Sequence, residues 1–441
     1  MDEFELAEAS AGPTTRVQLS PKWDACEPLA GACAIRRRRR ANRYERPKKM
    51  RILFAHSFYR VPGGEDRHVQ DQFELVSRSH SVDALFESNR ELSPGPRAAG
   101  QMLYSSSKRR KAGAAMDRFA PDVVHVHNIY PSLGPAVLLA AGERGVPVVM
   151  TVHNLRLRCP NGLMFTDKAL CRRCESGNYL NALVHPCFPT HKQAGAYATI
   201  LWIHRFMMRL NDRVARFIAP SEFVRFRLRE WGIPEERIRL VPHFVQSPRN
   251  LIPEAVSGRY GLFLGRLSAE KGLAGLLMAL QRAGDPPFLI AGDGPLKGEL
   301  VRLARGLSLS NTRFLGQRPH PEMAGLLAGA RYVALPSISE EASPLAALEA
   351  LSAGRPLLVS DRGSLPEFVA RGEGLACRPE DIDDISKKLL RLMDDELLQR
   401  ASIQAARAAH SLFTPRRHVE ALDAVYREVS RPTHDADRHP G

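Results

Sequence analysis

Short apolar runs alternate with stretches of helical periodicity from Met50 onwards. Runs of this length predict buried strands, and their alternation with helices is typical of parallel β-α-β units. The first series of expected strands is Ile52–Ala55, Val123–Val126, Val146–Thr151, Phe217–Ala219 and Ile238–Val241. The second series is Gly261–Leu264, Phe288–Ala291, Thr312–Leu315, Tyr332–Leu335, Pro356–Val359 and Gly374–Ala376. The pattern therefore predicts an α/β protein with two doubly wound, Rossmann-like domains that face a central cleft.

The two series suggest where the domains begin and end. We expect an N-terminal domain over residues 50–246 and a C-terminal domain over 258–415, joined by a polar linker at 247–257 that holds two prolines. A helix over 416–430 is expected to pack back on the N-terminal domain, and 431–441 to form a tail. Ligands of such sheets bind beyond the carboxyl ends of the strands, so the loops that follow the strands are the candidate sites.

Residues 1–49 differ from the rest of the chain. They mix small and polar residues without a period and contain the run Arg36–Arg40. We expect a disordered or misassigned leader, with Met50 as the initiator. A basic arm that contacts anionic lipid is the alternative.

The net charge of the chain indicates which classes of binding partner to expect. The chain has 441 residues, 44% of them hydrophobic, and a formal net charge of +15. Aromatic residues are not interleaved with the basic clusters, so we expect no nucleic-acid partner. The sequence has neither an apolar run long enough to span a membrane nor a signal-peptide pattern. We expect a cytoplasmic protein, with peripheral contact at the inner face of a membrane as an option.

Two carboxylates eight residues apart, Glu341 and Glu349, mark an apolar helix in the second domain. Pro344 suits its first turn, and Leu345, Leu348 and Leu351 form one stripe. If both acids are helical they lie about 12 Å apart, which suits the two ends of one hydroxyl-rich ligand. The alternative is a pair of solvated helix-end acids.

Two glycine-containing loops follow strands of the same domain. In the first, Gly265 and Arg266 precede Lys271, and the two cations with a helix N-terminus suit a diphosphate. In the second, Gly292 and Gly294 form a tight turn. The alternatives are solvated cations and a simple turn.

Together these motifs resemble the retaining glycosyltransferases of family 4, which have the GT-B fold. The matching segments are Gly265-Arg266, Glu270-Lys271-Gly272, Gly292-Asp293-Gly294-Pro295, Glu341 with Glu349, and Ala353-Gly354-Arg355-Pro356. The resemblance extends from Met50 to about Val429 and implies a nucleoside-diphosphate sugar as donor.

The resemblance also implies roles for single residues. Arg266 and Lys271 stabilise the diphosphate, Glu349 binds the ribose, and Glu341 lies beside the transferred sugar. Backbone amides around Ser343 and Leu345 are expected to contact the donor. The family often has Gly-Phe-Gly after the first acid, where this chain has Ala-Ser-Pro. The proline removes one amide donor, which we interpret as subfamily variation.

The first domain offers residues for the opposite side of the donor. Gly63 and Gly64 open a helix after the first strand, and the resemblance implies that this loop faces the donor. His125 and His127 share one face of a strand, with His127 nearer the loop, and His153 follows the next strand. By resemblance, His127 and His153 line the acceptor side. A structural role is the alternative for both.

The implied reaction is retaining transfer of a sugar to a hydroxyl of a saccharide or lipid-linked acceptor, without a cofactor for catalysis. The expected catalytic residues are His127, Arg266, Lys271 and Glu341. A nucleotide-sugar epimerase and a non-catalytic nucleotide-sugar-binding protein are the alternatives.

Four cysteines cluster in an insertion at about 155–190 in the first domain. Cys159, Cys171, Cys174 and Cys187 form a pattern that suits structural zinc, with His185 as a substitute ligand. Free buried thiols and a redox pair are the alternatives. Similar cysteine-bearing segments occur in some family 4 enzymes, so we expect the insertion to shape the acceptor pocket. We interpret Thr199–Leu210 as core packing, with an amphipathic surface that touches a lipid-linked acceptor as the alternative.

Overall fold

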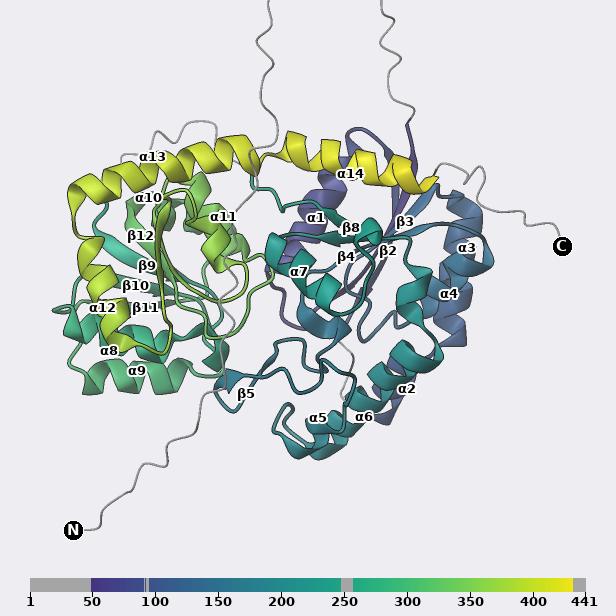
Figure 1. Ribbon diagram of the computed structural model, residues 1–441, viewed down its shortest axis with the longest axis horizontal. Helices are drawn as coiled ribbons and strands as arrows, with labels where there is room; N and C mark the ends of the chain where they lie inside the picture. The colour runs from purple at the N-terminus through teal and green to yellow at the C-terminus, as the bar shows by residue number, and fades with distance from the viewer. Residues whose placement is uncertain (1–48, 91, 93–94, 247–256, 431–441) are drawn as a thin grey trace, which may run out of the picture. The chain divides into compact units, whose positions relative to one another are not determined.

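The computed structural model describes residues 49–90, 92, 95–246 and 257–430. They form two six-stranded sheets with helices around them (Figure 1). The expected leader, linker and tail lie outside the described residues, apart from Lys49 and Ser257.

The first sheet has the strand order β2-β1-β3-β4-β7-β8, and every neighbouring pair is parallel. Its strands are β1 (Arg51–Phe58), β2 (Ser81–Ser88), β3 (Val123–Val126), β4 (Val148–Thr151), β7 (Arg216–Ala219) and β8 (Ile238–Leu240). A short antiparallel hairpin, β5 (Phe165–Thr166) and β6 (Ala169–Leu170), lies in the cysteine insertion.

The second sheet has the order β11-β10-β9-β12-β13-β14 and is also parallel throughout. Its strands are β9 (Tyr260–Leu264), β10 (Phe288–Ala291), β11 (Thr312–Gly316), β12 (Ala330–Leu335), β13 (Leu357–Ser360) and β14 (Gly374–Cys377). In both sheets the order reverses at the first strand, so the loops after β1 and β3, and after β9 and β12, flank the switch points where ligands bind.

Helices connect the strands. The first half contains α1 (Gly64–Ser77), α2 (Pro96–Leu103), α3 (Ser106–Phe119), α4 (Ala136–Glu143), α5 (Asn181–Val184), α6 (His191–Trp202) and α7 (Glu222–Glu230). The second contains α8 (Leu273–Arg282), α9 (Lys297–Gly306), α10 (His320–Gly329), α11 (Leu345–Ser352), α12 (Ile382–Arg391), α13 (Asp395–Leu412) and α14 (Pro415–Ser430). Shorter turns are η1 (Leu155–Leu157), the π-helix η2 (Ile203–Met207), η3 (Leu210–Arg213), η4 (Glu235–Arg237), η6 (Ala269–Lys271) and η7 (Leu365–Phe368).

Every strand expected from the sequence is present, with ends that differ by a few residues. The sequence analysis missed β2, because this edge strand is mostly half-buried and mixes polar with apolar residues. It also missed the two-residue strands of the hairpin, which are too short to show a period.

Apolar clusters cover both faces of each sheet. The last helix, α14, contributes Leu422, Val425 and Tyr426 to a cluster with Ile52 and Phe54 of β1. The C-terminal helix therefore packs on the first sheet, although it follows the second in the chain (Figure 1). Among the described residues, no helix is long and apolar enough to cross a membrane.

Candidate functional site

The glycine loops after β9 and β10 interlock beside the switch point of the second sheet. Gly292 has a φ of +155°, and a Cβ built there would lie 1.8 Å from the backbone oxygen of Gly265. A Cβ on Gly294 would lie 2.4 Å from the backbone oxygen of Leu267. Only glycine lets the loops after β9 and β10 approach this closely. These contacts explain why the sequence places glycines at both loops.

Lys271 and Glu341 meet beside these loops. Lys271 Nζ donates to Glu341 Oε1 at 2.5 Å, and Ser337 Oγ donates to the same oxygen at 2.7 Å. Burial alone would raise the pKa of Glu341, but the Lys271 charge and the two hydrogen bonds outweigh burial and lower it. Glu341 is therefore a carboxylate at neutral pH that holds the Lys271 ammonium in place.

Glu349 lies on α11 at a cavity of about 390 Å³. Arg67 of α1 donates to Glu349 Oε1 at 2.8 Å, so residues from both halves of the chain meet at this carboxylate. Burial raises the pKa of Glu349, and the Arg67 charge opposes that rise. The cavity is also lined by His320 and Phe244.

The expected helical spacing of the two acids is wrong in one respect. The helix α11 begins at Leu345, with Pro344 as its N-cap, so Glu341 lies in the preceding loop and only Glu349 is helical. Neither acid is a solvated helix end, since their side chains are only 16% and 19% exposed.

The remaining donor-side residues surround this loop. A Cβ on Gly64 would lie 3.5 Å from the side chain of Leu345, so the loop after β1 faces the start of α11, while Gly63 is the N-cap of α1. Ser343 is half-buried in the same loop. Arg266 is exposed, and its guanidinium has no ion-pair partner among the residues that the structure describes.

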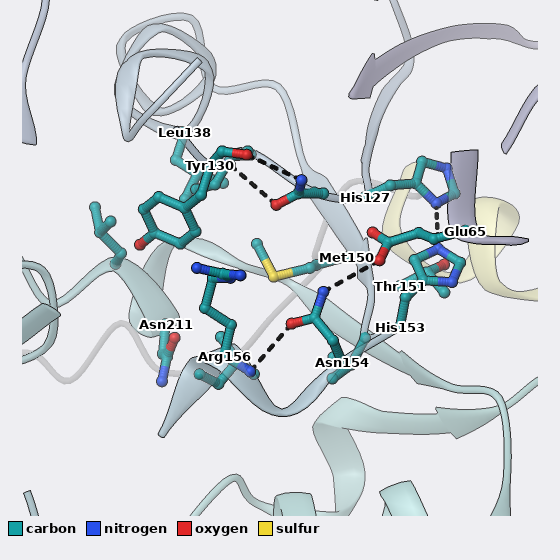
Figure 2. A pocket seen from close by; sticks show the side chains of 15 residues that line it. Glu65, His127, Tyr130, Leu138, Met150, Thr151, His153, Asn154, Arg156 and Asn211 are labelled. Atoms are coloured by element: carbon teal, nitrogen blue, oxygen red, sulfur yellow. Dashed lines mark hydrogen bonds between the residues drawn. The ribbon is translucent and has the colours of Figure 1, made fainter. Parts of the chain in front are cut away.

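A second cavity, of about 60 Å³, lies beyond the carboxyl ends of β3 and β4 (Figure 2). Its lining includes His127 and His153, and a hydrogen bond of 2.8 Å joins His127 Nδ1 to His153 Nε2. The rings of His125 and His127 stack at 4.3 Å, as expected for side chains on one face of β3. Burial lowers the pKa of His127 well below its usual value, and neighbouring histidines add to the effect. His127 Nε2 is buried without a hydrogen-bond partner within the described part of the chain.

Glu65 forms the polar wall of this cavity (Figure 2). Its Oε2 accepts hydrogen bonds from the Tyr59 hydroxyl at 2.8 Å and from Asn154 Nδ2 at 3.2 Å. Its Oε1 is buried without a partner among the described residues, and burial raises the pKa of the Glu65 carboxyl group. The apolar side chains of Leu138 and Met150 line the cavity as well, together with polar residues that include Arg156 and Asn211. The cavity is called the acceptor pocket below, after the expectation that His127 and His153 line the acceptor side. It combines apolar side chains with one carboxylate oxygen that has no partner among the described residues.

Comparison with known families matches most of the chain. Residues 62–247 match the model described as Glycosyltransferase Family 4, and residues 252–409 match the model of Glycosyl transferases group 1. The chain belongs to glycosyltransferase family 4. It is a glycosyltransferase.

Relatives of this transferase support the assignment. It is 28% identical over 360 residues to a glycogen synthase of Mycobacterium tuberculosis, which covers 79% of this chain and 80% of the relative. It is 22% identical over 340 residues to the putative teichuronic acid biosynthesis glycosyltransferase TuaC of Bacillus subtilis, covering 75% of this chain and 78% of the relative.

Solved structures confirm the GT-B fold predicted from the sequence. A glycosyltransferase from Rickettsia africae superimposes with a TM-score of 0.63 at 15% identity, covering 86% of this chain and 98% of the other. HepE of Anabaena, solved with UDP and glucose, gives a TM-score of 0.59 at 18% identity, with coverage of 85% and 99%.

The four cysteines of the insertion all line one small cavity, of about 10 Å³. All four are free thiols, and burial raises the pKa of Cys159, Cys174 and Cys187. Among the described residues, no group of three or more His, Cys, Asp or Glu side chains is arranged to hold a metal ion. The zinc site expected from the cysteine spacing stays a prediction.

The sequence analysis missed three residues that join the halves of the transferase. Arg227 Nη2 donates to Glu340 Oε1 at 2.6 Å, and Arg172 of the insertion donates to the same oxygen. The acid next to Glu341 is thus held by cations from α7 and from the insertion. The doubled acid Glu340-Glu341 was the only pointer in the sequence, because the partners are more than a hundred residues away.

The interpretation of Thr199–Leu210 as core packing is wrong for part of the segment. Ile200, Leu201 and Leu210 are buried, whereas Trp202 and Phe206 are each 46% exposed. The segment continues from α6, which ends at Trp202, into the π-helix η2, whose extra residue per turn changes the direction of the side chains from Ile203 onward.

Proposed function

We propose that the transferase moves a sugar, with retention of anomeric configuration, from a nucleoside diphosphate to a hydroxyl of a saccharide or lipid-linked acceptor. The observation that carries the proposal is the meeting of Lys271 and Glu341 beside the interlocked glycine loops, facing the Gly63-Gly64 loop. A cation held by a carboxylate at the switch point of a parallel sheet suits a diphosphate ligand.

In this proposal the donor extends along the second sheet. Arg266 and Lys271 bind the diphosphate, and the close approach of the loops at Gly265, Gly292 and Gly294 leaves their backbone open to the phosphates. Glu349 accepts hydrogen bonds from the ribose hydroxyls in the cavity of about 390 Å³. Glu341 and the amides near Ser343 and Leu345 contact the sugar.

The transfer step needs no nucleophile from the protein. The acceptor hydroxyl oxygen bonds to the anomeric carbon on the face from which the diphosphate leaves, and the bond from that carbon to the phosphate oxygen breaks. The hydroxyl proton passes to the departing phosphate oxygen. Arg266 and Lys271 stabilise the negative charge that gathers on the diphosphate.

On the acceptor side, we propose that His127 and His153 contact the acceptor or the transferred sugar. The low pKa of His127 keeps its ring neutral, so it adds no positive charge beside the diphosphate. The unpaired oxygen of Glu65 supplies an acceptor for a hydroxyl in the acceptor pocket.

The proposal is tested by a thermal-shift screen of nucleotide sugars, followed by calorimetry on the best donor. Lys271→Ala and Glu349→Ala are each expected to weaken donor binding by roughly tenfold or more, because each removes a charged hydrogen-bonding partner. Lys388→Ala is the matched control, since Lys388 is also partly buried and paired with a carboxylate but lies on α12.

Unchanged donor binding in both site variants would overturn the donor assignment. The anomeric configuration of the product, measured by NMR, tests retention separately. An inverted product would contradict the proposed step while leaving the donor site intact.

A further inference from the structure

Large apolar side chains stand exposed beside the cysteine insertion. In the described part of the chain, seven of the twelve exposed large apolar residues lie between positions 163 and 207. We call six of them the apolar patch: Leu180, Leu183, Val184, Trp202, Phe206 and Met207. Val184 is 75% exposed and Met207 68%. Such a concentration of exposed apolar side chains marks an interaction surface.

The apolar patch rests on a packed base. Its helices α5 and α6 share a buried cluster formed by Cys174, Tyr179, Ala182, Ala198 and Leu201. The rings of Trp202 and Phe206 lie 5.8 Å apart, one helical turn from each other. A Cβ on Gly195 of α6 would lie 3.1 Å from the side chain of Leu183. The patch is therefore held as one surface by α5, α6 and η2.

The surroundings of the apolar patch are positively charged. Residues 163–213 contain seven Lys or Arg and three Asp or Glu. Lys168, Arg173 and Lys192 are exposed, and the Arg205 guanidinium lies 4.7 Å from the centre of the Phe206 ring. Aromatic and aliphatic side chains flanked by cations are typical of surfaces that lie in the headgroup region of a bilayer.

Buried residues link the segment that carries the apolar patch to the acceptor pocket. His204 of η2 is hydrogen-bonded at 2.8 Å to the hydroxyl of Tyr130, which lines that pocket. Leu210, three residues beyond Met207, lines it as well.

We propose that the apolar patch docks the transferase on a bilayer that contains anionic phospholipid. Apolar side chains enter the headgroup boundary, and the surrounding cations contact lipid phosphates. A second copy of this chain fits less well, because it would bring the same positive charge against the patch. This docking does not depend on which acceptor the enzyme uses.

Vesicle flotation with phosphatidylglycerol and phosphatidylcholine tests the proposal. The wild-type chain is expected to bind vesicles that contain phosphatidylglycerol, and less so as salt rises. The triple variant Trp202→Ser, Phe206→Ser, Met207→Ser should bind at least about tenfold more weakly. The control variant Leu390→Ser, Ile403→Ser removes two exposed apolar side chains from α12 and α13 and should bind as the wild type does.

Failure of the wild-type chain to bind these vesicles, or equal binding by the triple variant, would overturn the proposal. Self-association that the triple variant abolishes, without vesicle binding, would instead assign the patch to a second copy. Donor hydrolysis should be unchanged in the triple variant. If the wild-type chain neither hydrolyses nor transfers from any nucleotide sugar, the proposed function is contradicted, but the vesicle-binding result is unaffected.

Discussion

Arg67 and Glu349 form an ion pair of 2.8 Å between α1, which packs on the first sheet, and α11, which packs on the second. The carboxylate expected to bind the donor ribose is therefore already occupied by a guanidinium. Because the Arg67 side chain is 37% exposed, the pair contributes only about 0–1 kcal/mol. A ribose that donates to Glu349 has to compete with this pair.

Removing Arg67 should favour the donor. Arg67→Met keeps the apolar stem and frees Glu349, so we expect the donor dissociation constant to fall by up to about fivefold. Glu349→Gln should raise it by roughly tenfold. Calorimetry measures both, with the exposed Arg400→Met as control. If Arg67→Met weakens binding as much as Glu349→Gln does, Arg67 itself holds the donor.

The buried ion pair of Arg227 and Glu340, which joins the two halves of the chain, should contribute more to the free energy of unfolding than an exposed pair does. Their side chains are 1% and 5% exposed, so removing Arg227 leaves the buried Glu340 carboxylate with only the exposed Arg172 as a cationic partner among the described residues. Arg227→Ala is expected to lower the free energy of unfolding in urea by about 3 kcal/mol or more. Arg225→Ala, on the same helix but 37% exposed, should cost about 1 kcal/mol at most. Equal costs for the two variants would contradict this reading.

Buried histidines should make the fold sensitive to acid. Burial lowers the pKa of His418 to about 4, below the usual value of 6.5. The unfolded chain therefore binds the His418 proton more tightly than the folded chain does. The contribution of neutral His418 to the free energy of unfolding is fully present above pH 6.5 and is lost as pH falls toward 4. The free energy of unfolding of the wild type should drop by up to about 3 kcal/mol more than that of His418→Gln over this range.

The control for this pH dependence is His410→Gln, since His410 is exposed on α13. Urea unfolding at several pH values gives the comparison. A wild type and a His418→Gln variant that lose stability in parallel would show that the pKa of His418 is the same in the folded and the unfolded chain.

The zinc prediction for the insertion is tested by elemental analysis. We expect about one zinc ion per chain, and a loss of thermal stability after chelation, because the four thiols line one cavity. Cys174→Ser should lose the metal, whereas Cys377→Ser, a buried cysteine of the second sheet, should keep it. A fully folded chain without metal would favour free thiols.

Much of the fold and half of the site could be predicted from the sequence. Apolar runs such as Val123–Val126 and Phe288–Ala291 are buried on both faces of a parallel sheet, so their pattern marks them without knowledge of their neighbours. The glycines of the loops after β9 and β10 follow the strand ends closely, as does Lys271, so the sequence could predict that they lie close together. The family assignment rests on the same local motifs.

Only the tertiary structure decided which distant groups meet. The sequence contains Arg67, Arg172 and Glu340, but their pairing depends on how two sheets and an insertion come together across more than a hundred residues. It contains Trp202 and Phe206, but only the packing of α6 and η2 decides that both side chains are partly exposed and do not lie in the core. Periodicity fixes local structure, because it depends on near neighbours; charge pairing and exposure depend on the packing of the whole chain.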